Sequence, residues 1–243
     1  MKTLWLILVS MRPKQWTKNL VLFAGVVFSE RFLEPALVER SFAGFLVFCV
    51  LSGGIYMLND LVDRRRDEEH PSKRMRPISS GALGPVTAGV AAAALLGGGL
   101  VAAAFTGLEF LLFAAAFTIV NAAYSLRLRE MVIIDVIAIS FSFLIRAGAG
   151  VAVLHAEVPR LEFSAWLWIC TLFLSLFLAI CKRRNEFCSL ESAGRHRRVL
   201  DDYSVRLLDQ LVGIAGTSTV VSYSIYTVWP STVEKFGTSD LVY

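Results

Sequence analysis

Residues 41–60 read SFAGFLVFCVLSGGIYMLND, an apolar run that ends on two polar side chains, Asn59 and Asp60. Crossing the hydrocarbon core of a bilayer takes about 20 mostly apolar residues in a helix. The run has this length, and its first charged residue comes only at its end. The segment therefore predicts a membrane-spanning helix that finishes in a polar site.

The remainder of the chain has the same apolar character. Of its 243 residues, 56% are hydrophobic and 18% are charged, and the mean hydropathy is +0.61. Soluble domains carry about 25% charged residues, so we expect an all-α, polytopic transmembrane helical bundle that forms one domain over 1–243.

Residues 1–10 predict an interfacial helix rather than a cleaved signal peptide. The predicted spans are 19–36, 41–60, 86–105, 108–126, 131–154, 163–181 and 207–229.

The basic residues between these spans predict the orientation in the membrane. Nineteen Lys and Arg fall on the side of the N-terminus and four on the opposite side. Lys and Arg are enriched in cytoplasmic loops, which places the N-terminus and the loops at about 60–85, 127–130 and 182–206 in the cytoplasm. Short basic loops between apolar runs also argue against a nucleic-acid partner, which needs a solvated basic face.

A row of acidic side chains follows the span at 41–60. Asn59, Asp63 and Asp67 are spaced four residues apart, with Asp60 beside them, so a helix would carry all four on one face. Carboxylates crowded in this way need a cation, and Mg²⁺ prefers such oxygen ligands together with water and phosphate oxygens. An ordinary helix end paired with the neighbouring arginines is the alternative.

A basic loop comes next, HPSKRMRPISSG at residues 70–81. Its two prolines and its glycine predict an ordered turn rather than more helix. Lys73 and Arg76 are candidates to bind phosphate oxygens. Acids that hold a metal beside bases that hold phosphate predict a site for a metal–diphosphate.

These motifs resemble the UbiA superfamily of intramembrane prenyltransferases. Asn59–Asp67 is similar to its NDxxDxxxD motif, Lys73–Gly81 to the continuation of that motif, and Tyr124–Arg129 to its tyrosine-plus-basic motif. The superfamily has nine spans, of which this chain offers seven, so the chain is either truncated or a short member. The resemblance implies a Mg²⁺ cofactor on Asn59, Asp60, Asp63 and Asp67, with Asp60, Asp63 and Asp67 as the catalytic groups.

One branch, the decaprenyl-phosphate phosphoribosyltransferases, is the most similar. It shares the opening RPKQWTKN at 12–19 and the segment KRRNE at 182–186, where aromatic prenyltransferases carry a second acidic motif. A single acidic motif and a basic cluster suit two phosphorylated substrates, phosphoribosyl diphosphate and a polyprenyl phosphate in the lipid bilayer. The resemblance implies a cytoplasm-facing site in a bacterial inner membrane. The candidate substrate-binding residues are Lys14, Tyr56, Lys73, Arg76, Tyr124, Arg127, Arg146, Lys182 and Arg183.

An aromatic prenyltransferase and a transporter are the alternative functions. An aromatic prenyltransferase that transfers a polyprenyl group to a ring is the nearest alternative, because the acidic motif serves either reaction. A transporter would place its charges near the middle of several spans, whereas here they crowd at the ends. Arg146 is the exception, since it lies inside a predicted span, eleven residues beyond Asp135 and too far along the helix to pair with it. The oligomeric state, a homo-oligomer included, stays open.

Overall fold

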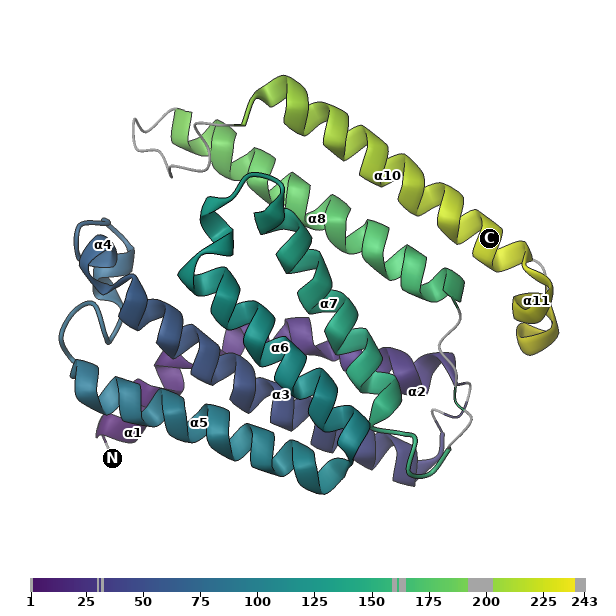
Figure 1. The fold of residues 1–243 in the computed structure, drawn as a ribbon, viewed down its shortest axis with the longest axis horizontal. Helices are drawn as coiled ribbons and strands as arrows, with labels where there is room; N and C mark the ends of the chain where they lie inside the picture. Colours follow the sequence, from purple (N-terminus) through teal and green to yellow (C-terminus); the bar gives the residue numbers. More distant parts are fainter. Residues whose placement is uncertain are drawn as a thin grey trace. The chain divides into compact units, whose positions relative to one another are not determined.

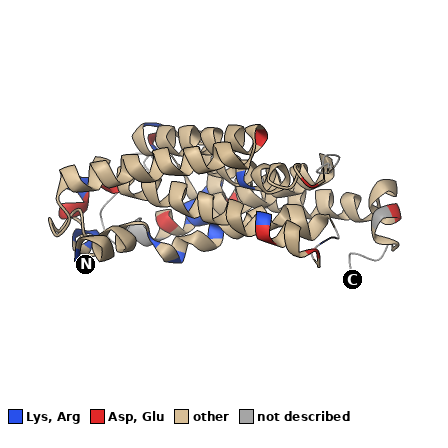
Figure 2. Cartoon of the chain, turned by 90° about the horizontal axis from the view of Figure 1, so that it is seen from below, with Lys and Arg blue, Asp and Glu red and all other residues tan. Residues whose placement is uncertain are grey.

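The chain is all-helical over the residues that the computed structural model describes, namely 2–29, 31, 33–158, 161, 165–191 and 203–238. Six of its helices are long and apolar enough to cross a membrane. They are α3 (Pro35–Val62), α5 (Pro85–Thr106), α6 (Leu108–Leu126), α7 (Ile134–Ala152), α8 (Ala165–Glu191) and α10 (Val205–Val228). Figure 2 shows their long uncharged stretches, with acidic and basic residues together near the N-terminus.

The chain forms two compact units, and α7 contributes to both. The first unit holds residues 1–127 and 145–161, and the second holds residues 128–144 and 162–243. In the first, α3 packs between α5 and α6 (Figure 1). In the second, α8 and α10 lie side by side. The shorter elements are α1 (Lys2–Ser10), η1 (Pro13–Phe23), α2 (Ala24–Phe28), α4 (Arg64–Glu68), η2 (Lys73–Met75), η3 (Leu128–Glu130) and α11 (Pro230–Phe236).

The first predicted span, 19–36, is not a single α-helix, and this prediction was wrong. The structure has the 3₁₀ helix η1 followed by the five-residue α2, and α3 begins at Pro35. The charges near residue 30 interrupt the apolar run, and Arg31 forms an ion pair with Glu34 (Nε to Oε1, 2.5 Å). At about 2.0 Å per residue in a 3₁₀ helix and about 1.5 Å in an α-helix, η1 and α2 still extend for about 30 Å along α3.

Glycines allow the backbones of α2 and α7 to cross closely in the first unit. A Cβ atom on Gly150 would lie 2.0 Å from the carbonyl oxygen of Leu22, and one on Gly25 would lie 2.2 Å from that of Gly150. Leu22 is fully buried at this crossing and belongs to the core with Phe48, on α3. The crossing therefore fixes η1 and α2 against the core of the unit.

α8 extends beyond the predicted span 163–181 and reaches Glu191. The loop predicted to begin at residue 182 is therefore helical for its first ten residues. Ion pairs along the helix favour this extension, because Arg183 contacts Glu186 (Nη1 to Oε2, 2.5 Å) and Lys182 contacts the same side chain (Nζ to Oε1, 3.8 Å). Residues 192–202, which belong to the predicted loop 182–206, lie outside the described residues.

His155 connects two segments of the first unit at the end opposite the acidic row. Its Nδ1 contacts Glu109, at the start of α6, and its Nε2 donates to the carbonyl of Leu161 (2.9 Å). Burial lowers the pKa of His155, but the bond to Leu161 and the hydrogen bond and charge of Glu109 outweigh burial, so the pKa is raised above 6.5. The folded protein therefore favours the imidazolium form.

This raised pKa predicts a pH dependence of stability. The contribution is complete below the unfolded pKa of about 6.5 and is lost as the pH rises through the higher folded value. Between about pH 6 and about pH 8, the Tm of the wild type in detergent should fall more than that of the Glu109→Gln variant. Parallel Tm curves for the two proteins would contradict the assignment.

Candidate metal–diphosphate site

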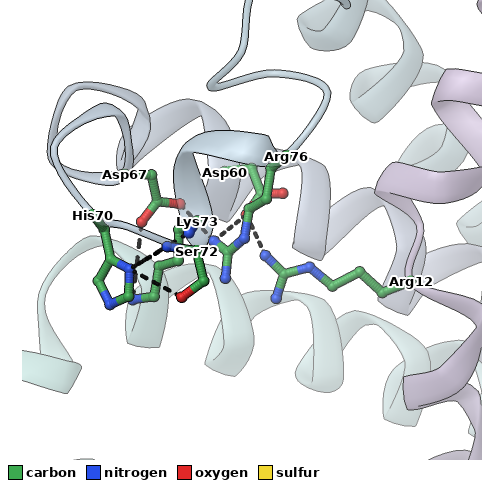
Figure 3. Close-up of polar contacts among 7 residues, drawn as sticks. All are labelled: Arg12, Asp60, Asp67, His70, Ser72, Lys73 and Arg76. Atoms are coloured by element: carbon green, nitrogen blue, oxygen red, sulfur yellow. Dashed lines mark hydrogen bonds and ion pairs between the residues drawn. The ribbon is translucent and has the colours of Figure 1, made fainter.

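Two buried carboxylates and three cationic side chains meet at the end of α3 (Figure 3). Arg76 bridges the carboxylates: its Nη1 lies 3.0 Å from Asp60 Oδ1 and 2.5 Å from Asp67 Oδ2. Arg12 contacts the same Asp60 oxygen, and Lys73 Nζ lies 3.9 Å from Asp67 Oδ1. The carboxylate side chains are only 2% and 3% exposed, so these cations supply the charge that burial requires.

The acidic row is not one uninterrupted helix face, which corrects the prediction. α3 ends at Val62, Asp63 has φ −87° and ψ 0°, and α4 begins at Arg64. The backbone ladder nevertheless continues, since Asp63 N donates to Asn59 O (2.9 Å) and Asp67 N to Asp63 O (2.8 Å). Asp60 and Asp67 are buried, whereas Asn59 and Asp63 are partly exposed. The row therefore has a buried pair and a more accessible pair.

The basic loop is ordered, as its prolines and glycine predicted. The short helix η2 carries Lys73, and His70 Nδ1 accepts from the backbone N–H of Ser72 (3.3 Å) and of Lys73 (3.4 Å). Ile78 and Leu83 are buried against Met57 of α3. These apolar contacts hold the loop against α3 and bring Arg76 to the carboxylates.

The oxygen donors at this site fit a magnesium ion. Within the described part of the chain, no three His, Cys, Asp or Glu side chains converge on one point that could hold a metal. Mg²⁺ does not need such a cage, because it uses one or two carboxylates and completes its shell with water and substrate phosphate. Asn59 and Asp63 are partly exposed residues with oxygen donors, and the buried Asp60 and Asp67 belong to the same row.

Arg12 is a member of this cluster that is not among the site residues predicted from the sequence. It lies between α1 and Pro13, at φ 54° and ψ 66°, a left-handed conformation that is uncommon outside glycine. Its guanidinium carbon lies 5.2 Å from the centre of the Tyr56 ring. The predicted candidate Lys14, two residues later, is exposed. The position of Arg12 immediately before a proline was the only local indication of an unusual backbone.

Arg146 is buried within the first unit, in a polar network around Asn19. Its Nε donates to Asn19 Oδ1 (2.9 Å), and its guanidinium carbon lies 4.6 Å from the centre of the Phe117 ring. Ser52 Oγ donates to the same Asn19 oxygen (3.3 Å), and Asn19 Nδ2 contacts Cys49 Sγ (3.4 Å). The network connects η1, α3 and α7, and within it the amide oxygen of Asn19 and the face of the Phe117 ring give the buried guanidinium favourable contacts.

Tyr124 and Arg127 lie at the end of α6 in the first unit. Tyr124 is partly exposed on the last turn, and Arg127 is exposed at the residue that follows the helix. Because α6 packs against α3, both helices belong to the same unit as the carboxylates. Their predicted contacts with substrate stay predictions.

The second unit holds Lys182 and Arg183, which differ sharply in exposure. Lys182 is 62% exposed, whereas Arg183 is 1% exposed and pairs with the buried Asp135 (Nε to Oδ2, 2.7 Å). The Tyr203 hydroxyl donates to Asp135 Oδ1 (2.8 Å), and burial above all raises its pKa to about 12, so the hydroxyl remains a donor. Arg183 therefore faces carboxylates, and Lys182 is the accessible cation.

These observations define the class of protein as a helical membrane bundle with a charged site at the end of α3. Residues 19–196 match the UbiA prenyltransferase family, and the chain belongs to it. The decaprenyl-phosphate phosphoribosyltransferase of Corynebacterium glutamicum is 32% identical over 89% of this chain and 65% of its own length. That of Mycolicibacterium smegmatis is 30% identical over 89% of this chain and 68% of its own length. The chain thus spans about two thirds of these relatives.

The fold is similar to that of a solved member of the family. The structure of a UbiA homologue from Archaeoglobus fulgidus bound to GPP and Mg²⁺ superposes with a TM-score of 0.77. The match covers 98% of this chain and 83% of that one at 20% sequence identity. The membership and the fold together confirm the predicted all-α bundle of the UbiA type, a multi-pass membrane protein.

Proposed function

We propose that this protein transfers a 5-phosphoribosyl group from phosphoribosyl diphosphate to a polyprenyl phosphate such as decaprenyl phosphate. The observation that carries the proposal is the mixed cluster of Asp60, Asp67, Arg12, Arg76 and Lys73, because it offers both carboxylates for a metal and cations for a diphosphate. Relatives named decaprenyl-phosphate phosphoribosyltransferase support this donor and acceptor. The proposed location is a bacterial inner membrane with the site facing the cytoplasm.

Some residues of the chain are proposed to bind the diphosphate leaving group, and others to bind the acceptor. Asn59 and Asp63, with Asp60 and Asp67, would hold Mg²⁺, which when bound neutralises charge on the departing diphosphate. Arg76 and Lys73 would bind the diphosphate oxygens. Tyr56 and Tyr124 would orient oxygens of the substrates.

The reaction needs no general base from the protein. An oxygen of the ionised acceptor phosphate forms a bond to C1 of the ribose as the C1–diphosphate bond breaks, through an oxocarbenium-like state. Because the acceptor is already an anion, the chain has to position it rather than deprotonate it. Lys14 and Arg127 are the exposed cations proposed for this task, whereas the exposed Lys182 is proposed to bind phosphate oxygens of the donor. Arg146 and Arg183 are assigned supporting contacts within their units.

Mass spectrometry of lipids tests the proposal. Purified protein is incubated with Mg²⁺, phosphoribosyl diphosphate and a polyprenyl phosphate, and we expect a phosphoribosyl lipid. A parallel reaction with 4-hydroxybenzoate and a polyprenyl diphosphate tests the aromatic alternative. A prenylated ring without the phosphoribosyl lipid would overturn the proposed function.

The Lys182→Asp variant tests the basic cluster. Reversing the charge of this exposed side chain should raise the KM for the donor about tenfold, the scale of one lost charge-assisted hydrogen bond. Lys182→Arg keeps the charge and should remain near the wild-type value. A donor KM that is unchanged in Lys182→Asp would count against a phosphate contact at this position.

A further inference from the structure

The charged cluster is arranged in two layers. Asp60 and Asp67 form the inner layer at 2% and 3% exposure, whereas Arg12 and Arg76 are 26% and 27% exposed and Lys73 is 40% exposed. Two negative and three positive charges leave the cluster with a formal charge of about +1. The carboxylates are therefore neutralised before any metal ion is bound.

This layering has a consequence for the order in which ligands bind. A divalent cation that approaches alone can reach the carboxylate oxygens of Asp60 and Asp67 only by displacing the guanidinium groups that already bond to them. A diphosphate anion meets the same groups as favourable partners. Once the anion holds the guanidinium groups, the carboxylate oxygens become available to the metal.

We propose that Arg12 and Arg76 are exchangeable counter-ions of Asp60 and Asp67, which transfer to the diphosphate oxygens when a metal–diphosphate binds. Arg12 thereby becomes a substrate-positioning residue of the site. Its left-handed backbone and its place over the Tyr56 ring hold the guanidinium within reach of Asp60. The inference rests on the proposed metal–diphosphate site and adds a coupling between its two ligands.

The coupling predicts opposite effects of one substitution on two affinities. In Arg12→Gln a competitor for Asp60 is lost, so Mn²⁺ alone, used as a probe for Mg²⁺, should bind about three- to tenfold more tightly. The preformed Mn²⁺–diphosphate complex should bind about tenfold more weakly, because one anion ligand is missing. A residue with a merely structural role would weaken both affinities or neither.

Calorimetric titrations of the purified full chain in detergent measure both affinities. Arg65→Gln is the matched control, since it removes an exposed arginine of α4 and should leave both values within about twofold of the wild type. Arg12→Lys retains the charge and should keep Mn²⁺ binding near the wild type. The same opposite shifts are expected for Arg76→Gln, which carries the test if Arg12→Gln does not fold.

The outcomes separate this inference from the proposed function. Shifts of the same sign in both titrations, or unchanged Mn²⁺ affinity in both arginine variants, would overturn the counter-ion exchange. Neither titration contains a phosphoribosyl donor or a lipid. Failure to form the phosphoribosyl lipid would therefore refute the proposed reaction but not the counter-ion exchange. Titrations that overturn the counter-ion exchange would likewise leave the proposed reaction standing.

Discussion

Replacing Asp63 by alanine should abolish Mg²⁺-dependent transfer while the protein remains folded. Asp63 lies between α3 and α4 and, like Asn59, is a partly exposed member of the acidic row, whereas Asp60 and Asp67 are buried. Removing one group that stabilises developing charge in an active site costs about 10²–10³-fold in kcat. We expect a loss of at least about 100-fold in the initial rate of product formation at saturating Mg²⁺.

The fold of this variant should be preserved. The backbone of Asp63 has a negative φ of −87°, which alanine adopts without strain. The control is Glu69→Ala, which removes an exposed acid shortly after α4 and should retain wild-type activity. Wild-type activity with normal Mg²⁺ dependence in Asp63→Ala would refute the metal assignment.

Gly150→Ala should be among the most destabilising single substitutions in the first unit. The added methyl group would lie 2.0 Å from the carbonyl oxygen of Leu22, and the atoms that it would meet are backbone atoms that cannot rotate away. Overpacking of a core typically costs about 1–3 kcal/mol, and more where nothing can yield. We expect a loss of about 3 kcal/mol and a fall of about 10 °C in Tm in detergent.

Gly98→Ala, in α5, is the matched control for this substitution. A Cβ atom at Gly98 would meet no other atom within 4 Å. Glycine inside a helix costs about 0.5–1 kcal/mol relative to alanine, so this change should leave Tm unchanged or raise it slightly. Equal falls in Tm for the two variants would contradict the close crossing of Leu22 and Gly150.

The long apolar helices were predictable because length and hydropathy alone specify a membrane span. α5 and α6 match the predicted spans to within about two residues. The helix type of the segment 19–36 could not be predicted in the same way. An apolar composition does not distinguish a 3₁₀ helix from an α-helix. The extension of α8 to Glu191 was missed because charged residues indicated a loop, although Arg183 and Glu186 stabilise the helix through their spacing.

The site was predictable in composition but not in its contacts. Spacing placed Asp60 and Asp67 on one side of a helix, yet no local pattern connects either of them to Arg12, which is 48 residues from Asp60. The role of Asn19 in burying Arg146 likewise spans 127 residues. Such partners are set by how η1 packs on α3 and α7, and that packing is a property of the tertiary structure.

The 3₁₀ geometry of η1 has a consequence for how tightly its sequence is constrained. With three residues per turn, side chains three positions apart are eclipsed along one straight edge. Trp16, Asn19 and Leu22 share such an edge, and Asn19 and Leu22 are fully buried on it. In an α-helix, side chains three positions apart would instead differ in direction by about 60° around the helix axis. Inserting a single residue between Asn19 and Leu22 would turn everything beyond it by about 120°. We therefore expect this segment to accept exchange of its outward side chains but not an insertion that breaks the three-residue repeat.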